Sequence, residues 1–356
     1  MPCILNDSIS IFNWITKKMK NVLLTGGLGY IGSHIALALI ERGYNPVIVD
    51  NLYNSSQSTL NTLQKLTNTV IPFFKIDVSD CKSMEEILSD NNIHDVIHLA
   101  AFKSVPESIQ MPQKYFENNV NGLKNLLKTV KKCKVKNFVF SSSAAIYDST
   151  NNFPVDEQGI LGYTNPYAFT KCCGEWMLSE FYRSNQQINI ANLRYFNPIG
   201  NCEGGQLGDH YKKNSTNIVP TIYKCILNEK PFEIFGDKYM TPDGSAIRDY
   251  IHVQDLGDVH AIMLDYIDNN IGNHVFNVGL GQGISVKELI TTFQSVNNIR
   301  FDVKISDPRI GDLPICFANA DKLKRSLNWT PKYDLKKMCA DAYKFFTINE
   351  QVRSFE

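Results

Sequence analysis

The residues best suited to chemistry in this chain are Tyr167 and Lys171, with Ser143 upstream of them. Asn165-Pro166, directly before the tyrosine, is typical of a helix start, because Asn caps free N–H groups and Pro favours the first helical position. Residues four apart share a helix face, so we expect the ammonium beside the phenol, where it favours the ionised form. A phenolate can take a proton from a substrate hydroxyl while a hydride leaves the neighbouring carbon. The spacing therefore predicts half of a redox site, although the same spacing is common in plain surface pairs.

A glycine loop near the start of the chain predicts where a hydride acceptor would bind. The apolar run 21–25 leads into Gly26, Gly29 and Gly32, after which residues 33–42 have helical apolar spacing. Glycines at these places let the backbone turn tightly, approach a pyrophosphate and pack against the helix. A second strand, 46–50, ends in Asp50, which suits a ribose 2′-hydroxyl and would repel a 2′-phosphate. The pattern favours NAD over NADP, and the alternative is a turn followed by an ordinary strand-end carboxylate.

Strands and helices alternate through the first half of the chain. Further strands are predicted at 72–76, 95–99, 137–141 and 188–195, and helices at 81–89 and 112–133. Such alternation predicts an α/β fold with a Rossmann-type doubly wound parallel sheet covered on both faces. Ligands of these sheets bind beyond the carboxyl ends of the strands. That rule selects residues 77–78, 100–103 and 141–143, which we expect to meet in one crevice beside the glycine loop.

The alternation loosens after about residue 197, which suggests a domain boundary there. We expect a dinucleotide-binding domain over residues 19–197. Residues 198–356 are expected to form mainly a smaller α/β lobe that holds the substrate, with some segments returning to the first domain. Arg248 and Arg309 in this lobe suit phosphate oxygens, although a surface ion pair would explain either one alone. Residues 1–18 are expected to be a disordered extension.

Composition excludes several classes of protein. Lys plus Arg and Asp plus Glu number 36 each, so no basic surface for nucleic acid is expected. Nine cysteines without a CxxC pair indicate reduced thiols and a cytoplasmic protein. His94 and His98 fall in or beside a predicted strand and lack helical ligand spacing, so no metal is expected. No apolar run is long enough to span a membrane.

From residue 21 almost to the C-terminus, the chain resembles UDP-glucose 4-epimerases of the extended short-chain dehydrogenase/reductase group. The resemblance is carried by TGGLGYIGS (25–33), VDNL (49–52), NNVNG (118–122), SSSA (141–144), YAFTK (167–171), RYFNP (194–198), RDYIHV (248–253) and GDLP (311–314). Two departures stand out, since the family usually has glycine where Asp148 stands and glycine-leucine where Ala101-Phe102 stand. Neither departure removes a catalytic group.

The resemblance implies a role for each site residue. Ser143, Tyr167 and Lys171 would be catalytic. An NAD site built on the glycine loop would include Gly26, Gly29, Tyr30, Ile31, Gly32, Asp50, Asn51, Asp77, Val78, Lys103, Asn118, Tyr167 and Lys171. The UDP-sugar would contact Lys103, Ser143, Tyr167, Asn197, Asn217, Phe235, Arg248, Arg309, Asp312 and Cys316. The resemblance also implies a homodimer through helices 114–133 and 166–184.

The implied activity is interconversion of UDP-glucose and UDP-galactose through transient oxidation at carbon 4. In the family, a small residue at position 316 also admits N-acetylated sugars, so Cys316 predicts activity on UDP-GlcNAc and UDP-GalNAc, unless it is only a small core residue. Another UDP-sugar 4-epimerase, acting on a uronate or a pentose, is an alternative. A nucleotide-sugar 4,6-dehydratase would need an acid and a base beside the serine, where Ala144-Ala145 stand. A non-catalytic NAD-binding sensor is the third alternative.

Overall fold

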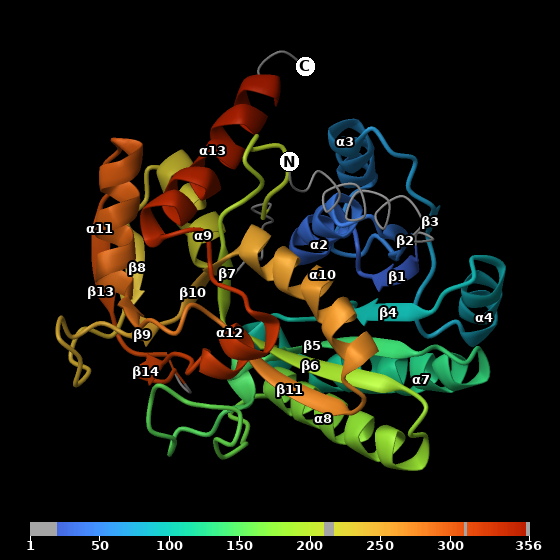
Figure 1. Cartoon of the computed structure of the whole chain (residues 1–356). Helices are drawn as coiled ribbons and strands as arrows, with labels where there is room; N and C mark the ends of the chain where they lie inside the picture. The colour runs from blue at the N-terminus through green and yellow to red at the C-terminus, as the bar shows by residue number, and fades with distance from the viewer. Residues whose placement is uncertain (1–19, 210–216, 310–311, 354–356) are drawn as a thin grey trace, which may run out of the picture.

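The computed structural model describes residues 20–209, 217–309 and 312–353, so the predicted extension, residues 1–18, lies outside the described part (Figure 1). A seven-stranded parallel sheet forms the centre of the first domain, in the order β11-β6-β5-β4-β1-β2-β3. Its strands are β1 (Asn21–Thr25), β2 (Asn45–Val49), β3 (Phe73–Phe74), β4 (Asp95–His98), β5 (Asn137–Ser143), β6 (Asn189–Tyr195) and β11 (Asn273–Val278). The predicted Rossmann-type doubly wound sheet is confirmed.

Two layers of helices cover the sheet, because alternate residues of each buried strand point to opposite faces. Val22 and Leu24 of β1 belong to the core on one face, and Leu23 belongs to the core on the other. The first face is covered by α2 (Tyr30–Glu41), α3 (Gln57–Thr67) and α10 (Val253–Asn269). The second face is covered by α4 (Cys81–Asp90), α7 (Gly122–Lys132) and α8 (Pro166–Ser184). Both faces are therefore buried, as the continuous apolar strands require.

The second lobe has small sheets and its own core, and lies to one side of the first domain (Figure 1). Its strands are β7 (Asn197–Ile199), β8 (Phe232–Phe235), β9 (Ile247–Arg248), β10 (Tyr250–His252), β12 (Ile284–Ser285), β13 (Val303–Ser306) and β14 (Ile315–Cys316). Its helices are α9 (Ile218–Leu227), α11 (Val286–Asn297) and α13 (Leu335–Arg353), whereas α12 (Asp321–Leu327) packs on α10 and β11 of the first domain. Between these elements the chain returns to the first domain, where α10 packs on α2 and β11 pairs with β6.

The helix predicted over residues 112–133 is interrupted. After the short α5 (Val105–Gln110), the chain forms α6 (Pro112–Tyr115), the π-helix η1 (Phe116–Asn121) and then α7. The wider π turn presents Asn119, which accepts from the Phe102 backbone N–H at 2.8 Å and donates to the Thr170 hydroxyl at 3.0 Å. These bonds join the segment after β4 to α8, and such π turns are frequent at functional sites.

Candidate active site

Helix α8 begins as predicted and presents Tyr167 beside Ser143. The Asn165 side chain accepts from the Ala168 backbone N–H at 2.9 Å and so caps the helix. Tyr167 is half-buried in the first turn of this helix, and Ser143 is the last residue of β5. The Ser143 side chain is near enough to the phenol to lower its pKa, and both residues line one cavity. The structure therefore brings together two of the three residues predicted to be catalytic.

Lys171 lies one turn beyond Tyr167 but directs its ammonium to the sheet. Its Nζ donates to the Ser141 carbonyl at 2.5 Å and lies 4.9 Å from the centre of the Phe140 ring. Burial lowers the pKa of Lys171 to about 7. Burial also raises the pKa of the Tyr167 phenol, and the Ser143 side chain opposes that rise. That Lys171 and a nicotinamide ring together favour ionisation of this phenol stays a prediction.

The glycine loop between β1 and α2 is shaped to hold a pyrophosphate. Gly26 has a φ of +70°, which favours glycine, and a Cβ at Gly32 would lie 2.3 Å from the Gly26 carbonyl oxygen. Gly29 precedes α2 and gives it no side-chain cap, so the first N–H groups of the helix are left for a ligand. This close approach of backbone to backbone, with uncapped N–H groups, fits the phosphates of NAD.

The residues expected to hold the rest of NAD lie at the carboxyl ends of neighbouring strands. Asp50 follows β2 and accepts from the Leu28 backbone N–H at 3.1 Å, which fixes its carboxylate beside the glycine loop. The Asn51 side chain donates to Asp77 at 2.8 Å. Next along the chain, Val78 is buried. The Asn118 side chain, which belongs to the π-helix η1, donates to Asn119 at 2.9 Å. A carboxylate at the end of β2 suits a ribose hydroxyl.

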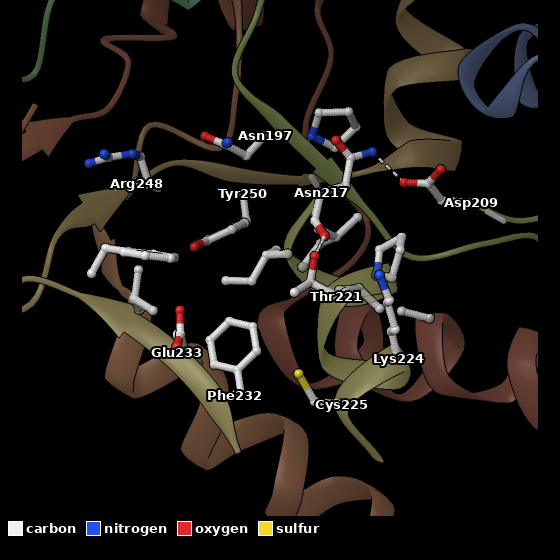
Figure 2. A pocket seen from close by; sticks show the side chains of 18 of the residues that line it. Asn197, Asp209, Asn217, Thr221, Lys224, Cys225, Phe232, Glu233, Arg248 and Tyr250 are labelled. Atoms are coloured by element: carbon white, nitrogen blue, oxygen red, sulfur yellow. Dashed lines mark hydrogen bonds between the residues drawn. The ribbon is translucent and has the colours of Figure 1, made fainter. Parts of the chain in front are cut away.

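A cavity of about 970 Å³ lies between the first domain and the second lobe. Predicted site residues of both domains line it, and Figure 2 shows Asn197, Asn217 and Arg248 among its lining residues. The first domain contributes Tyr30, Ile31, Lys103, Ser143 and Tyr167, and the second lobe contributes Asn197, Asn217, Phe235, Arg248, Arg309 and Asp312. Ten predicted site residues do not line the cavity: Gly26, Gly29, Gly32, Asp50, Asn51, Asp77, Val78, Asn118, Lys171 and Cys316.

Two arginines and one carboxylate line the lobe side of the cavity. Arg309 donates to Asp312 at 2.8 Å, and its guanidinium lies 4.8 Å from the centre of the Phe235 ring. Arg248 reaches the same carboxylate at 4.0 Å. Two guanidinium groups around one carboxylate leave an excess positive charge, which suits a diphosphate, and the aromatic ring offers a face for a base.

Cys316 lies behind the wall of the cavity. It is part of β14, pairs with Arg248 of β9, and packs against a cluster that includes Ala144 and Phe196. Burial raises the pKa of its thiol to about 11, so the thiol is neutral at pH 7. Ala144 follows Ser143, and Phe196 lines the cavity. A larger side chain at position 316 would therefore press on the wall near the reacting groups.

Sequence reasoning missed several residues that shape the cavity. Asp209 accepts a hydrogen bond from Asn217 and so orients that amide toward the cavity (Figure 2). Tyr195 and Tyr250 also line the cavity. The RYFNP and RDYIHV motifs drew attention to the two tyrosines, but nothing in the polar, glycine-rich segment 200–216 pointed to Asp209.

The described residues contain no metal-binding cluster of three or more His, Cys, Asp or Glu side chains. Over the same residues, none of the helices has the length and apolar character needed to cross a bilayer.

Comparison with known proteins places these features in a family. The model of the NAD dependent epimerase/dehydratase family matches residues 22–279. The UDP-glucose 4-epimerase of Bacillus subtilis (strain 168) is 37% identical over 329 residues, which are 92% of this chain and 97% of that protein. The structure of UDP-glucose 4-epimerase from Bifidobacterium longum in complex with NAD+ and UDP is 37% identical, with a TM-score of 0.89 over 93% of this chain and 99% of that one. The structure of the UDP-Glc/GlcNAc 4-epimerase from Campylobacter jejuni is 33% identical. Its TM-score is 0.81, over 92% of this chain and 99% of that one.

Proposed function

The chain belongs to the NAD dependent epimerase/dehydratase family, and from this premise we propose that it is a UDP-glucose 4-epimerase of galactose metabolism. The observation that carries the proposal is the placement of two groups in one cavity. Tyr167 and Ser143 line its first-domain side, while Arg248 and Arg309 line the lobe side. A UDP-hexose can then place its diphosphate at the arginines and its sugar at the phenol.

The glycine loop, with Gly26, Gly29 and Gly32, would hold NAD, which would supply reversible hydride transfer at carbon 4 of the sugar. Tyr167 takes the proton of the carbon 4 hydroxyl and later gives it back, and Ser143 donates a hydrogen bond to the reacting oxygen. Inversion requires the sugar to turn over between the two transfers. Arg248 and Arg309 hold the diphosphate during that turn, Asp312 orients the two guanidinium groups, and Phe235 lies against the uracil.

The same residues support the rival activities less well. A 4,6-dehydratase requires an acid and a base beside the serine, and the two residues after Ser143 are alanines. Retention of Ser143, Tyr167 and Lys171 argues against a non-catalytic sensor.

Incubation of the purified protein with UDP-galactose, without added NAD, tests the proposal. We expect UDP-glucose to accumulate until the two sugars reach equilibrium. Formation of a 4-keto-6-deoxy sugar would identify a dehydratase instead. No conversion of either hexose by the NAD-loaded protein would refute the proposal.

The substrate range is proposed to include UDP-GlcNAc and UDP-GalNAc. Cys316 is small, and the similar Campylobacter jejuni protein is described as a UDP-Glc/GlcNAc epimerase. Cysteine leaves the wall formed by Ala144 and Phe196 undisturbed, whereas a phenol ring there would displace it toward the sugar. Overpacking typically costs about 1–3 kcal/mol, which is roughly tenfold or more in discrimination.

Replacing Cys316 with tyrosine should therefore suppress turnover of the N-acetylated pair by about tenfold or more and spare the plain pair. The measurement is kcat/KM for both pairs, with Cys316→Ala as the control that keeps the residue small. An equal loss on both pairs would mean that Cys316 serves packing alone. Absence of wild-type activity on UDP-GlcNAc would refute the broader range.

We propose in addition a cytoplasmic homodimer that pairs through residues 114–133, in α6, η1 and α7, and through 166–184, in α8. The NAD-binding domain is proposed over residues 19–197 and the substrate lobe mainly over 198–356. Trp176 of α8 is 67% exposed and Phe116 of η1 is 36% exposed, so large apolar side chains are available for a partner. The eight cysteines of the described residues are free, which fits a reducing compartment. Light scattering of the purified protein tests the dimer, and a monomer mass would contradict it.

A further inference from the structure

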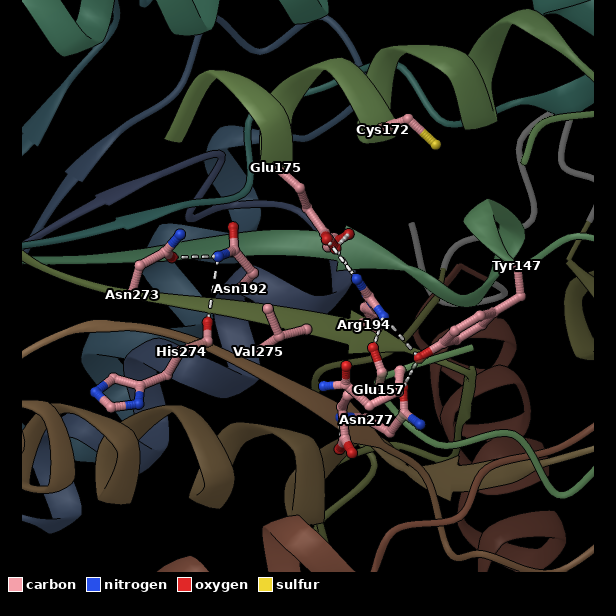
Figure 3. A network of polar contacts seen from close by, with 12 residues as sticks. Tyr147, Glu157, Cys172, Glu175, Asn192, Arg194, Asn273, His274, Val275 and Asn277 are labelled. Carbon is pink, nitrogen blue, oxygen red and sulfur yellow. Dashed lines mark hydrogen bonds and ion pairs between the residues drawn. The ribbon is translucent and has the colours of Figure 1, made fainter. Parts of the chain in front are cut away.

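Behind the catalytic residues lies a buried ion pair to which the proposed reaction gives no role. Glu175 of α8 and Arg194 of β6 are 8% and 3% exposed. Two hydrogen bonds join them, from Nε to Oε1 at 2.9 Å and from Nη2 to Oε2 at 2.7 Å (Figure 3). A buried ion pair seldom stabilises a fold more than apolar side chains of the same volume. Stability alone therefore does not account for this pair.

Glu175 acts on the catalytic residues in two ways. Ser142, which precedes Ser143 at the end of β5, donates its hydroxyl to Glu175 Oε1 at 2.5 Å. Glu175 also lies four residues after Lys171 and eight after Tyr167, so the three share one face of α8. Its negative charge opposes the effect of burial on Lys171. One carboxylate is thus linked both to the strand that carries the serine and to the charge of the lysine.

Arg194 is held from its other side by a network of polar contacts. Its Nη1 donates to the Tyr147 hydroxyl at 2.9 Å and to the Glu157 carbonyl at 3.0 Å. The Tyr147 hydroxyl donates in turn to Asn277 of β11 at 2.6 Å (Figure 3). With partners on three nitrogens, the guanidinium has a fixed orientation, and so has the Glu175 carboxylate that it binds.

We propose that Glu175 and Arg194 are positioning residues for the reaction. Glu175 ties the end of β5, which carries Ser143, to α8 and keeps Lys171 protonated, and Arg194 holds Glu175 in place. Neither of the two lines the cavity. The consequence for turnover rests on the proposed epimerase function, whereas the consequence for Lys171 does not.

The direction of the pH effect follows from the groups that face Lys171. From β5, the Ser141 carbonyl accepts from its ammonium and the Phe140 ring lies beneath it. From β4, His98 has a pKa lowered to about 3, chiefly by burial, so it is neutral at pH 7. Tyr167 has a raised pKa and is also neutral. Removing the charge of Glu175 therefore lowers the pKa of Lys171 below about 7.

That lower pKa leaves more of the lysine neutral at pH 7. Because the Tyr167 phenolate needs the ammonium, turnover should then be lost at a lower pH on the alkaline side of the profile.

The experiment uses NAD-loaded protein and the variants Glu175→Gln, Glu175→Gln/Arg194→Met and Ser142→Ala. Glu180→Gln is the matched control, because it removes a carboxylate from the same helix, where Glu180 pairs with Arg183 on the surface. We measure kcat and KM for UDP-glucose against pH. The pKa of Lys171 is measured by NMR of carbon-13-labelled lysine, with Lys171→Arg to assign the signal.

We expect the Glu175 variants to lose about tenfold or more in kcat, with KM within about twofold, since the arginines that hold the diphosphate are unchanged. The pH at which kcat falls on the alkaline side, and the pKa of Lys171 measured by NMR, should both decrease by about half a pH unit or more. Ser142→Ala keeps both charges, so it should lower kcat without changing the pH at which kcat falls on the alkaline side. Glu180→Gln should match the wild type.

Each outcome decides the proposal. Glu175→Gln leaves the charge of Arg194 buried and unpaired and can fail to fold, whereas the double variant removes both charges. A folded double variant with wild-type kcat and an unshifted Lys171 pKa would overturn the proposal. If neither Glu175 variant folds, Ser142→Ala decides, and an unchanged kcat would overturn it.

The Lys171 titration is read without substrate, which separates the two proposals. A wild-type protein that converts no UDP-hexose would refute the epimerase function. In that case a downward shift of the Lys171 pKa in the double variant would still support the positioning role, and an unshifted pKa would overturn it.

Discussion

Tyr167→Phe should reduce kcat by about 10³-fold while leaving the affinity for the UDP-sugar almost unchanged. The reason is that the substitution deletes only the hydroxyl that takes the substrate proton. The groups expected to bind UDP, including Arg248 and Arg309, come from the second lobe and keep their contacts. The ring also stays in place on α8, so the fold should be preserved. Turnover of UDP-galactose and calorimetric titration with UDP measure the two quantities separately.

Ser143→Ala is the companion variant for this experiment. It removes the hydroxyl expected to bind the reacting oxygen but keeps the phenol, so a smaller loss is expected, of about 10²-fold. Near-normal turnover by Tyr167→Phe would mean that another residue accepts the proton. Loss of UDP binding in that variant would mean that the phenol serves the binding of UDP rather than the chemistry.

Gly32→Ala should abolish tight binding of NAD, the second large effect. The added Cβ would lie 2.3 Å from the Gly26 carbonyl oxygen and 2.7 Å from the Gly27 Cα, and both are backbone atoms that cannot move aside cheaply. The loop must then move away from α2. The glycine loop and the start of α2 together are expected to hold the pyrophosphate. Overpacking of this kind typically costs about 1–3 kcal/mol. The NAD released on denaturing the purified variant measures the effect.

Gly122→Ala is the matched control. A Cβ at Gly122 would meet only the Val78 side chain, at 3.5 Å, and an alanine in the first turn of α7 favours the helix. This variant should carry as much NAD as the wild type. Wild-type NAD content in Gly32→Ala would contradict the close packing of the loop against the helix.

The sequence predicted the elements that depend on local pattern. Apolar runs of five to eight residues predicted strands of the main sheet, and Asn165-Pro166 placed the start of α8. The glycine spacing predicted a tight loop before α2, where Gly26 and Gly32 are both constrained by backbone contacts. These features arise from neighbours in the chain, so they can be read without the fold.

The rest of the site depends on contacts between distant segments. The amphipathic pattern over residues 112–133 predicts a regular helix, but Asn119 makes bonds to Phe102 and Thr170 that favour a π turn. The direction of the Lys171 ammonium is set by the Ser141 carbonyl, thirty residues away. In the sequence, Glu175 looks like an ordinary helix residue, and Arg194 is part of the RYFNP motif. Only the packing of α8 on β6 pairs them.

Transfer of deuterium from carbon 4 of UDP-glucose is the most direct test of the central claim, which is that one hydride leaves this carbon and returns to its other face. The purified protein is incubated with UDP-glucose labelled with deuterium at carbon 4, and the UDP-galactose formed is analysed by mass spectrometry and NMR. The account predicts that the product keeps deuterium at carbon 4, because a hydride held by bound NAD would not exchange with water. Loss of the label to solvent would contradict the account, because it would mean that carbon 4 loses a proton rather than a hydride.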